Sequence, residues 1–197
     1  MAVVVGSTPY MEKNDEYAKE NIEWMIGLAW KHNLHLDFHI DYNLDPGKEP
    51  MVPRACKLLR EYGWPFEKTV VFGHCTRLTL LSDSEWKNLS LNARNLPVSF
   101  VGLPTSDLFM MRRPLNENSD ENQPGQRVRG TLQVPHMIQE HGFDAAIAIN
   151  NVGNAFTPHG SCDPLSLASF CVGIYQAGTK LDADLLYVRP NIQKLGF

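Results

Sequence analysis

Two histidines lie where apolar segments of this sequence end. His39 lies near the end of the segment that begins at Leu34, and His74 follows the apolar run that begins at Thr69. An imidazole can bind a metal ion, accept a proton or polarise a scissile bond near neutral pH. We therefore interpret His39 as a candidate metal ligand and His74 as a candidate catalytic base or electrophile. A polar side chain held by a neighbouring group is the simpler alternative for each, and the residues alone leave both interpretations open.

Hydroxyl, amide and acidic residues occupy similar positions elsewhere in the chain. Thr105 follows the fourth apolar run, and Asn150 and Asn151 follow the fifth. All three are candidate substrate-binding residues, since they could hydrogen-bond a small polar heterocycle. Asp41 and Asp107 are interpreted as turn-forming residues rather than catalysts, and the same interpretation is the simpler alternative for Asn150 and Asn151. Structural or solvated roles are expected for the histidines in predicted helices and loops, which are His32, His136, His141 and His159.

Strict alternation of apolar and polar residues over residues 34–40 is the clearest local pattern. It predicts a strand with one buried and one polar face, because successive side chains of a strand point to opposite sides. The apolar positions are Leu34, Leu36, Phe38 and Ile40, and the polar ones are His35, Asp37 and His39.

Five strands, each followed by a helix, are predicted along the chain. The strands are expected at residues 3–5, 34–40, 69–72, 98–101 and 145–149. Ser82 and Glu85 form a capping box, and Asp163 is an N-cap before Pro164, so both mark helix starts. Residues 104–130 interrupt the alternation and include a polar, turn-rich stretch, and a long mobile loop is expected there.

Alternation of strands and helices predicts a single α/β domain over residues 1–197 with a parallel sheet. An open doubly wound sheet and part of a barrel both satisfy this pattern. The turn at residues 6–9 has neither a glycine-rich fingerprint nor a Walker lysine. A complete (β/α)8 barrel has eight strand–helix units and about 250 residues, whereas this chain has 197 residues and five predicted units.

Composition narrows the classes of partner. The net charge is −4 with 43% hydrophobic residues, which gives no electrostatic argument for binding nucleic acid or an anionic membrane. No apolar stretch approaches the roughly 18 residues of a membrane span. The 4 cysteines lack metal-binding or secreted-domain spacing, so reduced thiols and a cytoplasmic location are expected.

Four segments together resemble the cytosine deaminase-like amidohydrolases. They are residues 4–10 (VVGSTPY), 39–41 (HID), 73–75 (GHC) and 150–165 (NNVGNAFTPHGSCDPL). Their order is similar to that of the last strands of the family barrel, and the resemblance extends over residues 3–178. It implies a partial TIM-type (β/α)8 barrel with about five parallel βα units, equivalent to strands four to eight.

The resemblance also implies roles for individual residues. His39 matches the fifth-strand metal ligand, and His74 matches the sixth-strand histidine that contacts substrate and the reactive water. Asn150 stands where the family has an eighth-strand Asp that binds the metal. Tyr42 stands where the cytosine deaminases have a proton-shuttling Glu, and tyrosine is a poor base at neutral pH because its ordinary pKa is near 10.

The HxH pair of the family's first strand has no counterpart in this chain, so the resemblance implies an incomplete metal site. We expect no bound metal, although zinc or iron would be the metal if one is present. The function expected first is that of a truncated or degenerate amidohydrolase that retains a small-molecule pocket. An active metal-dependent hydrolase of cyclic amides or amidines, completed by another chain, is the alternative, and an interaction or scaffold module is a third.

A five-stranded part of a barrel would leave both outer strands with unpaired backbone edges. Self-association or a chain that supplies the missing strands would cover these edges. We therefore expect a homodimer or such a partner.

Overall fold

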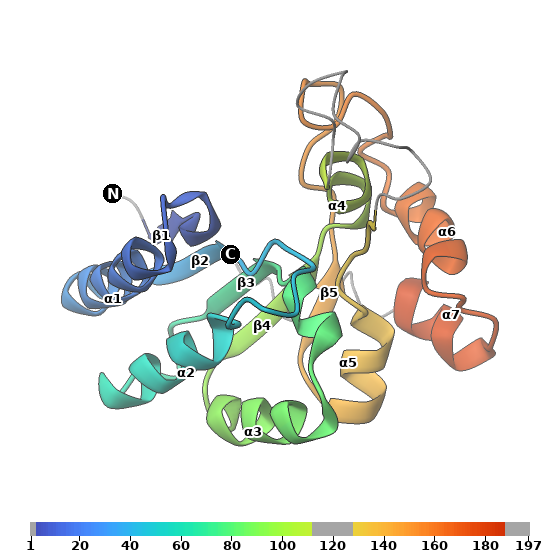
Figure 1. Cartoon of the computed structure of the whole chain (residues 1–197). Coiled ribbons are helices and arrows are strands. Elements are labelled where there is room, and N and C mark those ends of the chain that lie inside the picture. Colours follow the sequence, from blue (N-terminus) through green and yellow to red (C-terminus); the bar gives the residue numbers. More distant parts are fainter. Residues whose placement is uncertain (1–2, 112–127, 188–197) are drawn as a thin grey trace.

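Five parallel strands form one sheet in the order β1-β2-β3-β4-β5, as shown in Figure 1. The structure is a computed structural model that describes residues 3–111 and 128–187. The strands are β1 (Val4–Ser7), β2 (His35–Ile40), β3 (Val70–His74), β4 (Val98–Gly102) and β5 (Ala145–Ile147). The strands follow one another in sequence order and all run in the same direction. Between strands the chain crosses back through a helical connection, so the predicted α/β fold is confirmed.

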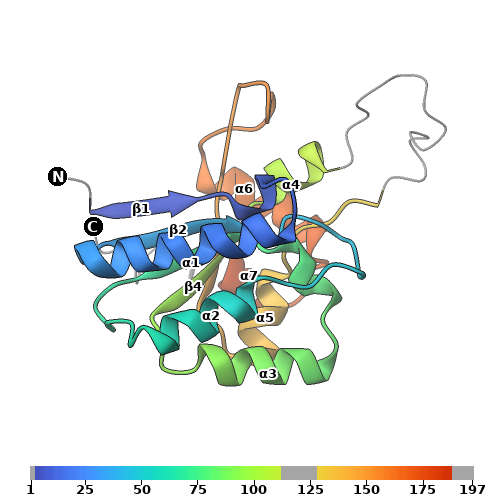
Figure 2. The ribbon, with the colours of Figure 1, turned by 60° about the vertical axis from the view of Figure 1, so that its left-hand side comes forward.

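Helices connect the strands. The α-helices are α1 (Asp15–His32), α2 (Val52–Glu61), α3 (Asp83–Ala93), α4 (Pro104–Met110), α5 (Val134–His141), α6 (Pro164–Ile174) and α7 (Lys180–Tyr187), and two short 3-10 helices are η1 (Pro9–Met11) and η2 (Thr76–Leu80). Figures 1 and 2 show α1, α2 and α3 on the same side of the sheet, whereas α4 lies beyond the carboxyl ends of the strands. No helix in the described part of the chain is long and apolar enough to cross a membrane.

The helix-covered face of the sheet is the apolar core. Leu36, Phe38 and Ile40 of β2 are at most 1% exposed, as their alternation in the sequence predicts. The Phe38 ring stacks at 6.0 Å on the ring of Phe72 in β3, which lies 5.6 Å from the ring of Phe100 in β4. These three strands are therefore held together by a continuous row of aromatic side chains.

The opposite face of the sheet carries the polar residues of β2. Strand register places Asp37 in a row with Gly6, Val71 and Ser99. Unlike the core residues, Asp37, Val71 and Ser99 of this row are half-buried, and Gly6 is exposed. This row shows that the predicted polar face of residues 34–40 is the less covered side of the sheet.

Helix ends follow the signals in the sequence. Ser82 and Glu85 form the complete capping box of α3, and the Asp163 carboxylate accepts hydrogen bonds from two backbone amides at the start of α6. Gly142 ends α5 in the left-handed conformation, which glycine adopts without steric cost. The two predicted helix starts, at Ser82 and Asp163, are confirmed.

Two boundaries differ from the predictions. Residues 104–110 form α4 rather than the start of a mobile loop; Pro104 occupies the first turn, where its missing N–H costs nothing. Residues 112–127 of the predicted loop lie outside the described residues. Strand β5 ends at Ile147, so Asn150 lies in the segment that follows the strand.

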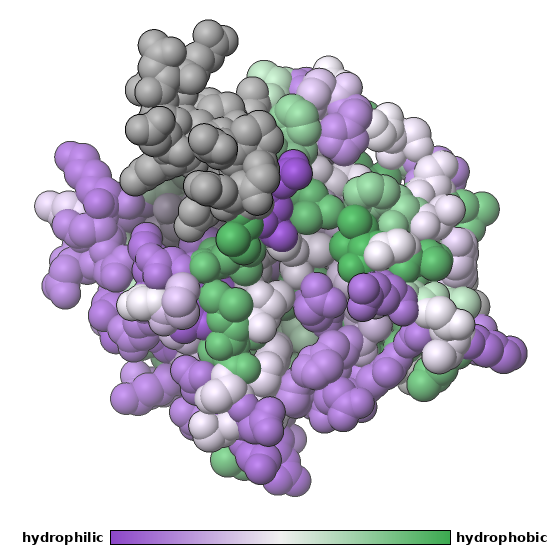
Figure 3. Space-filling view, turned by 45° about the vertical axis from the view of Figure 1, so that its right-hand side comes forward, coloured by the Kyte–Doolittle hydropathy of each residue, from purple (hydrophilic) through white to green (hydrophobic). Residues whose placement is uncertain are grey.

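Apolar side chains also occur on the outer surface near the end of the described chain. Leu165, Phe170 and Leu181 of α6 and α7 are exposed. Figure 3, in which this side of the molecule comes forward, shows apolar groups scattered among polar ones.

Candidate functional site

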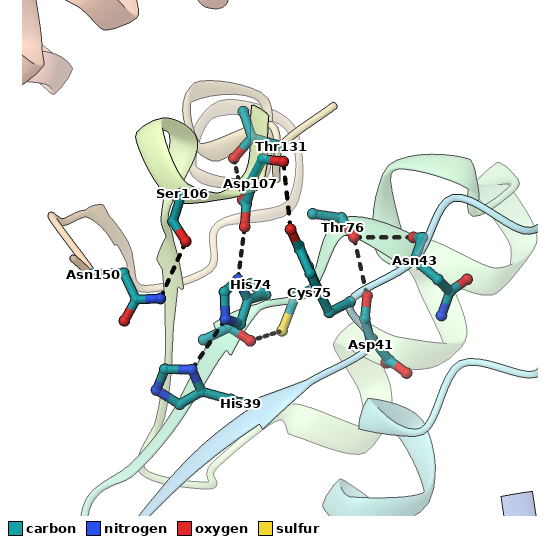
Figure 4. A network of polar contacts seen from close by, with 12 residues as sticks. His39, Asp41, Asn43, His74, Cys75, Thr76, Ser106, Asp107, Thr131 and Asn150 are labelled. Atoms are coloured by element: carbon teal, nitrogen blue, oxygen red, sulfur yellow. Dashed lines mark hydrogen bonds and ion pairs between the residues drawn. The ribbon is translucent and has the colours of Figure 1, made fainter. Parts of the chain in front are cut away.

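His39, His74 and Asp107 form a hydrogen-bonded chain at the carboxyl end of the sheet (Figure 4). His39 Nδ1 lies 3.0 Å from His74 Nε2. His74 Nδ1 lies 2.6 Å from Asp107 Oδ1. The two histidines are neighbours because β2 and β3 are adjacent parallel strands, whose carboxyl ends meet at one edge of the sheet.

Sharp backbone turns at the strand ends hold the two histidines together. His74 and Cys75 both have positive φ, 67° and 49°, in the left-handed region that non-glycine residues adopt rarely. The Cys75 N–H donates to the carbonyl of Ile40 at 3.0 Å. This bond ties the end of β3 to the end of β2, so the imidazoles project from adjacent, fixed backbones.

Asp107 reaches His74 from α4. Its side chain is fully buried, and its second oxygen, Oδ2, accepts a 2.6 Å hydrogen bond from the Thr131 hydroxyl. Burial raises the pKa of Asp107, while the hydrogen bond and charge of His74 oppose that rise. The interpretation of Asp107 as a turn-forming residue is wrong, because the carboxylate is a partner of the buried histidine.

The directions of these hydrogen bonds follow from the carboxylate. The separation of 2.6 Å is that of a charge-assisted bond, in which an ionised Asp107 accepts and the His74 Nδ1–H donates. His74 Nε2 then carries a lone pair in the neutral ring and accepts from the His39 Nδ1–H. His39 Nε2 has no hydrogen-bond partner among the described residues, and it is the one ring nitrogen of the pair available to another molecule.

His39 is favoured in its neutral form. Its side chain is half-buried, and this burial is the largest cause that lowers its pKa from the ordinary value. The neighbouring His74 lowers the pKa further, and Asp37 and Asp107 act in the opposite direction. A neutral His39 has a lone pair on one nitrogen, as the hydrogen-bond pattern requires.

Two tyrosines pack around His74. The Tyr42 ring centroid lies 4.5 Å from that of His74, and the Tyr10 ring meets His74 edge-on at 5.7 Å. Burial, followed by the nearby Asp107, raises the pKa of both phenols. Tyr42 stands where the resemblance implies a Glu, and its neutral hydroxyl cannot act as a base at neutral pH.

The three candidate substrate-binding residues, Thr105, Asn150 and Asn151, have different surroundings. Thr105, in α4, has a buried hydroxyl with no hydrogen-bond partner among the described residues. Asn150 donates to the Ser106 hydroxyl at 3.3 Å, beside the histidines in Figure 4. Asn151 instead accepts from Asn154 at 2.9 Å, which stabilises its own loop. The structure therefore places Asn150 near the histidines and gives Asn151 a local contact.

Asp41 forms a turn, as its position indicated: its φ is 55°, and its carbonyl accepts from the Asn43 N–H at 3.0 Å. Its side chain has a second role that the sequence did not indicate. Its carboxylate accepts hydrogen bonds from the backbone N–H groups of Met51 and Val52 at 2.8–3.0 Å. It thus caps α2, whose own N-cap residue makes no side-chain hydrogen bond. Near-complete burial raises the pKa of Asp41 to about 6. The signal in the sequence was Met51 at the start of α2. A methionine side chain cannot accept a hydrogen bond from the helix N-terminus as Ser, Thr, Asp or Asn can, so a cap had to come from elsewhere in the chain.

His136 and His141 belong to a separate cluster on the outer surface. The His141 ring stacks on Trp86 with centroids 4.4 Å apart, and His136 meets His141 edge-on at 5.0 Å. A surface cavity of about 930 Å³ borders both histidines. A second cavity of about 500 Å³ lies at the amino ends of the strands, where Thr69 and Val98 are found. Neither cavity includes His39 or His74.

The donor set does not fit a hydrolytic zinc or iron centre. Such a centre needs about three protein ligands and an open position for water. Within residues 3–111 and 128–187, no group of three or more His, Cys, Asp or Glu side chains could hold a metal ion. The His39–His74 hydrogen bond occupies one nitrogen of each ring, and the neutral amide of Asn150 is a weaker ligand than a carboxylate.

The structure is similar to 5-methylcytosine deaminase from Klebsiella pneumoniae. The complex of that enzyme with 5-fluorocytosine gives a TM-score of 0.75 at 16% sequence identity, over 93% of this chain and 42% of the deaminase chain. The complex with phosphonocytosine gives 0.74 at 15% identity, over 93% and 43%. No family model and no curated protein sequence matches the chain. The chain thus spans less than half the length of these deaminases, and the predicted partial-barrel fold is confirmed.

Proposed function

We propose that this chain is a degenerate deaminase-fold protein that binds a small polar ligand at His39 and does not carry out metal-dependent hydrolysis by itself. The observation that carries the proposal is the 3.0 Å hydrogen bond between His39 and His74. His74 Nε2 is engaged in this bond. In the family that the chain resembles, the sixth-strand histidine at this position contacts substrate and the reactive water instead.

The incomplete set of metal ligands is the reason that hydrolysis is not expected. Metal-dependent deamination depends on a metal ion that lowers the pKa of its bound water and so generates a nucleophile at neutral pH. Without the ion, attack must come from ordinary water, whose pKa is about 15.7. Neither Tyr42 nor Asn150 can replace the charged groups that the resemblance implies at their positions.

The groups beside the His39–His74 pair, together with the buried hydroxyl of Thr105 in α4, favour a planar ligand with polar edges. The Tyr10 and Tyr42 rings offer aromatic surface, Asn150 offers an amide, and Thr105 offers a buried hydroxyl without a partner among the described residues. Buried hydroxyls without partners are uncommon, so a ligand atom is a reasonable partner for Thr105. The 5-fluorocytosine bound by the deaminase is a planar polar heterocycle, and it is a suitable first probe.

Three measurements on the purified chain test this proposal. Protein prepared without chelator is analysed for metal, assayed for ammonia release from cytosine, and heated with and without 5-fluorocytosine. We expect less than stoichiometric metal, no turnover, and a higher melting temperature with ligand. His39→Ala should remove the thermal shift, whereas the matched variant His35→Ala, on the same face of β2, should retain it. Absence of any shift with a panel of nucleobases and cyclic amides would contradict ligand binding.

The free Nε2 of His39 favours a second candidate. If another chain supplied further metal ligands, this nitrogen could complete a site for hydrolysis of a cyclic amide or amidine. Stoichiometric zinc or iron in the purified protein, together with turnover, would support this candidate and exclude the first.

We also propose that the chain associates with itself or with a chain that supplies further strands. Within the described residues, β1 and β5 each pair with one neighbour only, and unpaired strand edges favour association. Solution mass measured across a wide concentration range tests this. A dimer or a co-purified partner is the expected result, and a monomer at all concentrations would contradict it.

A further inference from the structure

His35 and His39 lie on the same face of β2 but have different hydrogen-bond partners. The backbone N–H of Thr69 points at His35 Nδ1, 3.0 Å away. A backbone amide can only donate, so His35 Nδ1 must be an unprotonated acceptor. A neutral His35 therefore carries its proton on Nε2.

His39 has the opposite arrangement because its bonding starts from Asp107. The Thr131 hydroxyl donates to one carboxylate oxygen, and the other oxygen accepts from His74 Nδ1–H. When the His74 ring is neutral, its Nε2 carries a lone pair and accepts, which requires the proton of a neutral His39 to be on Nδ1. The identity of residue 107 thereby determines the protonation pattern of a ring two hydrogen bonds away.

We propose that Asp107 is a positioning residue that, through His74, keeps Nε2 of His39 unprotonated, so that the site selects ligands with an N–H or O–H donor. This inference rests on the ligand site proposed above and names the class of ligand that it takes. The Nε2 lone pair repels a carbonyl oxygen and attracts a donor hydrogen. The tautomer assignment itself needs no ligand.

Nitrogen NMR of histidine-labelled protein tests the assignment directly, since long-range proton–nitrogen spectra distinguish the two neutral tautomers. The chain has 7 histidines, and single substitutions His35→Gln and His39→Gln assign the two relevant rings. At pH 8 we expect His39 in the Nδ1–H form and His35, the internal control, in the Nε2–H form. A His39 ring in the Nε2–H form, or protonated on both nitrogens, overturns the proposal.

Substitutions then test whether Asp107 is the cause. Asp107→Asn replaces an obligatory acceptor with a group that can also donate, so His39 should become a mixture of tautomers while His35 is unchanged. If both rings keep their wild-type tautomers in folded Asp107→Asn, Asp107 is not the positioning residue. His74→Phe provides a second variant should Asp107→Asn not fold. It removes the acceptor for Nδ1–H, and His39 should revert to the Nε2–H form that isolated imidazoles prefer.

Paired ligands test the selectivity. Uracil and its 1,3-dimethyl derivative share a ring and two carbonyl groups, but the dimethyl compound has no N–H donor. We expect the dimethyl compound to bind at least about tenfold more weakly, because His39 Nε2 is left without a donor. Equal affinity for the two compounds would overturn the selectivity. Failure of every nucleobase and cyclic amide to bind would count against the proposed function, and the tautomer measurement would still decide the role of Asp107.

Discussion

The two faces of the central sheet consist of the same strands but differ in what covers them. On the helix side, Phe38, Phe72 and Phe100 are fully buried and packed ring against ring. On the other side, His39 is half-buried and joined to its neighbours by directional hydrogen bonds. The first face gains stability from apolar area removed from water. The second gains little stability in this way, and its polar groups can be used to recognise a ligand.

The contrast teaches that adjacent residues of one strand can serve different purposes. Phe72 fills the core, while Gly73 and His74, the last residues of the same strand, lie in the backbone that presents the site. A substitution should therefore affect stability or ligand binding according to the face on which it lies. The predictions below test this separation.

The largest effect is expected from Phe72→Ala. Truncation of a fully buried phenylalanine removes apolar contacts and leaves a cavity, which costs about 3–5 kcal/mol. The adjacent Val71 lies on the open face and is half-buried, so Val71→Ala should cost about 1 kcal/mol or less. The free energies of unfolding from urea titrations give both values, and equal losses would show that the two faces do not differ.

The sequence predicted the covered face well and the site only in part. The alternation over residues 34–40 defined both faces of β2, because strand periodicity is a local property. Asp107 was misinterpreted, and the capping role of Asp41 was missed, because their partners, His74 and Met51, lie 33 and 10 residues away and are set by tertiary folding. Helix α4 has only 7 residues, too few for a helical period to stand out from the polar stretch that follows.

Asp41 should give the next largest effect, as a dependence of stability on pH. Its pKa rises from 3.8 to about 6 in the folded protein, so the native state binds a proton more tightly than the unfolded chain does. Stability should be highest below pH 4, fall by about 2–3 kcal/mol between pH 4 and pH 6, and then remain constant as far as this group is concerned. Urea titrations across this range measure the slope.

Asp41→Asn should flatten that slope, because the amide does not ionise while its carbonyl oxygen can still accept from the amides of Met51 and Val52. Asp37→Asn, on the open face of the same strand, serves as the control and should preserve the slope. If Asp41→Asn retains the wild-type pH dependence, the buried carboxyl is not its source.

Ser82→Ala should have a smaller effect, about 1 kcal/mol, which is the usual cost of losing an N-cap. Each of the side chains of Ser82 and Glu85 accepts a hydrogen bond from the backbone N–H of the other residue at the start of α3. The helix covers the apolar face of the sheet, but this end of it is exposed to solvent. Ser90 lies later in the same helix and outside the capping box, so Ser90→Ala should change the free energy of unfolding by less. Equal losses in the two variants would mean that the box contributes nothing beyond helix propensity.

His39→Ala should have the smallest effect on stability and the largest effect on ligand binding. The side chain is half-buried on the open face, and its truncation leaves space through which water can hydrate the His74 nitrogen that loses its partner, so we expect a cost of about 0.5–1 kcal/mol. The same variant should show no thermal shift with 5-fluorocytosine. Phe72→Ala, studied at a temperature where it remains folded, should retain the ligand response despite its lower stability. Loss of binding without loss of stability in His39→Ala, and the reverse in Phe72→Ala, would show that the two faces of the sheet have different roles. If His39→Ala were as unstable as Phe72→Ala, His39 would belong to the core.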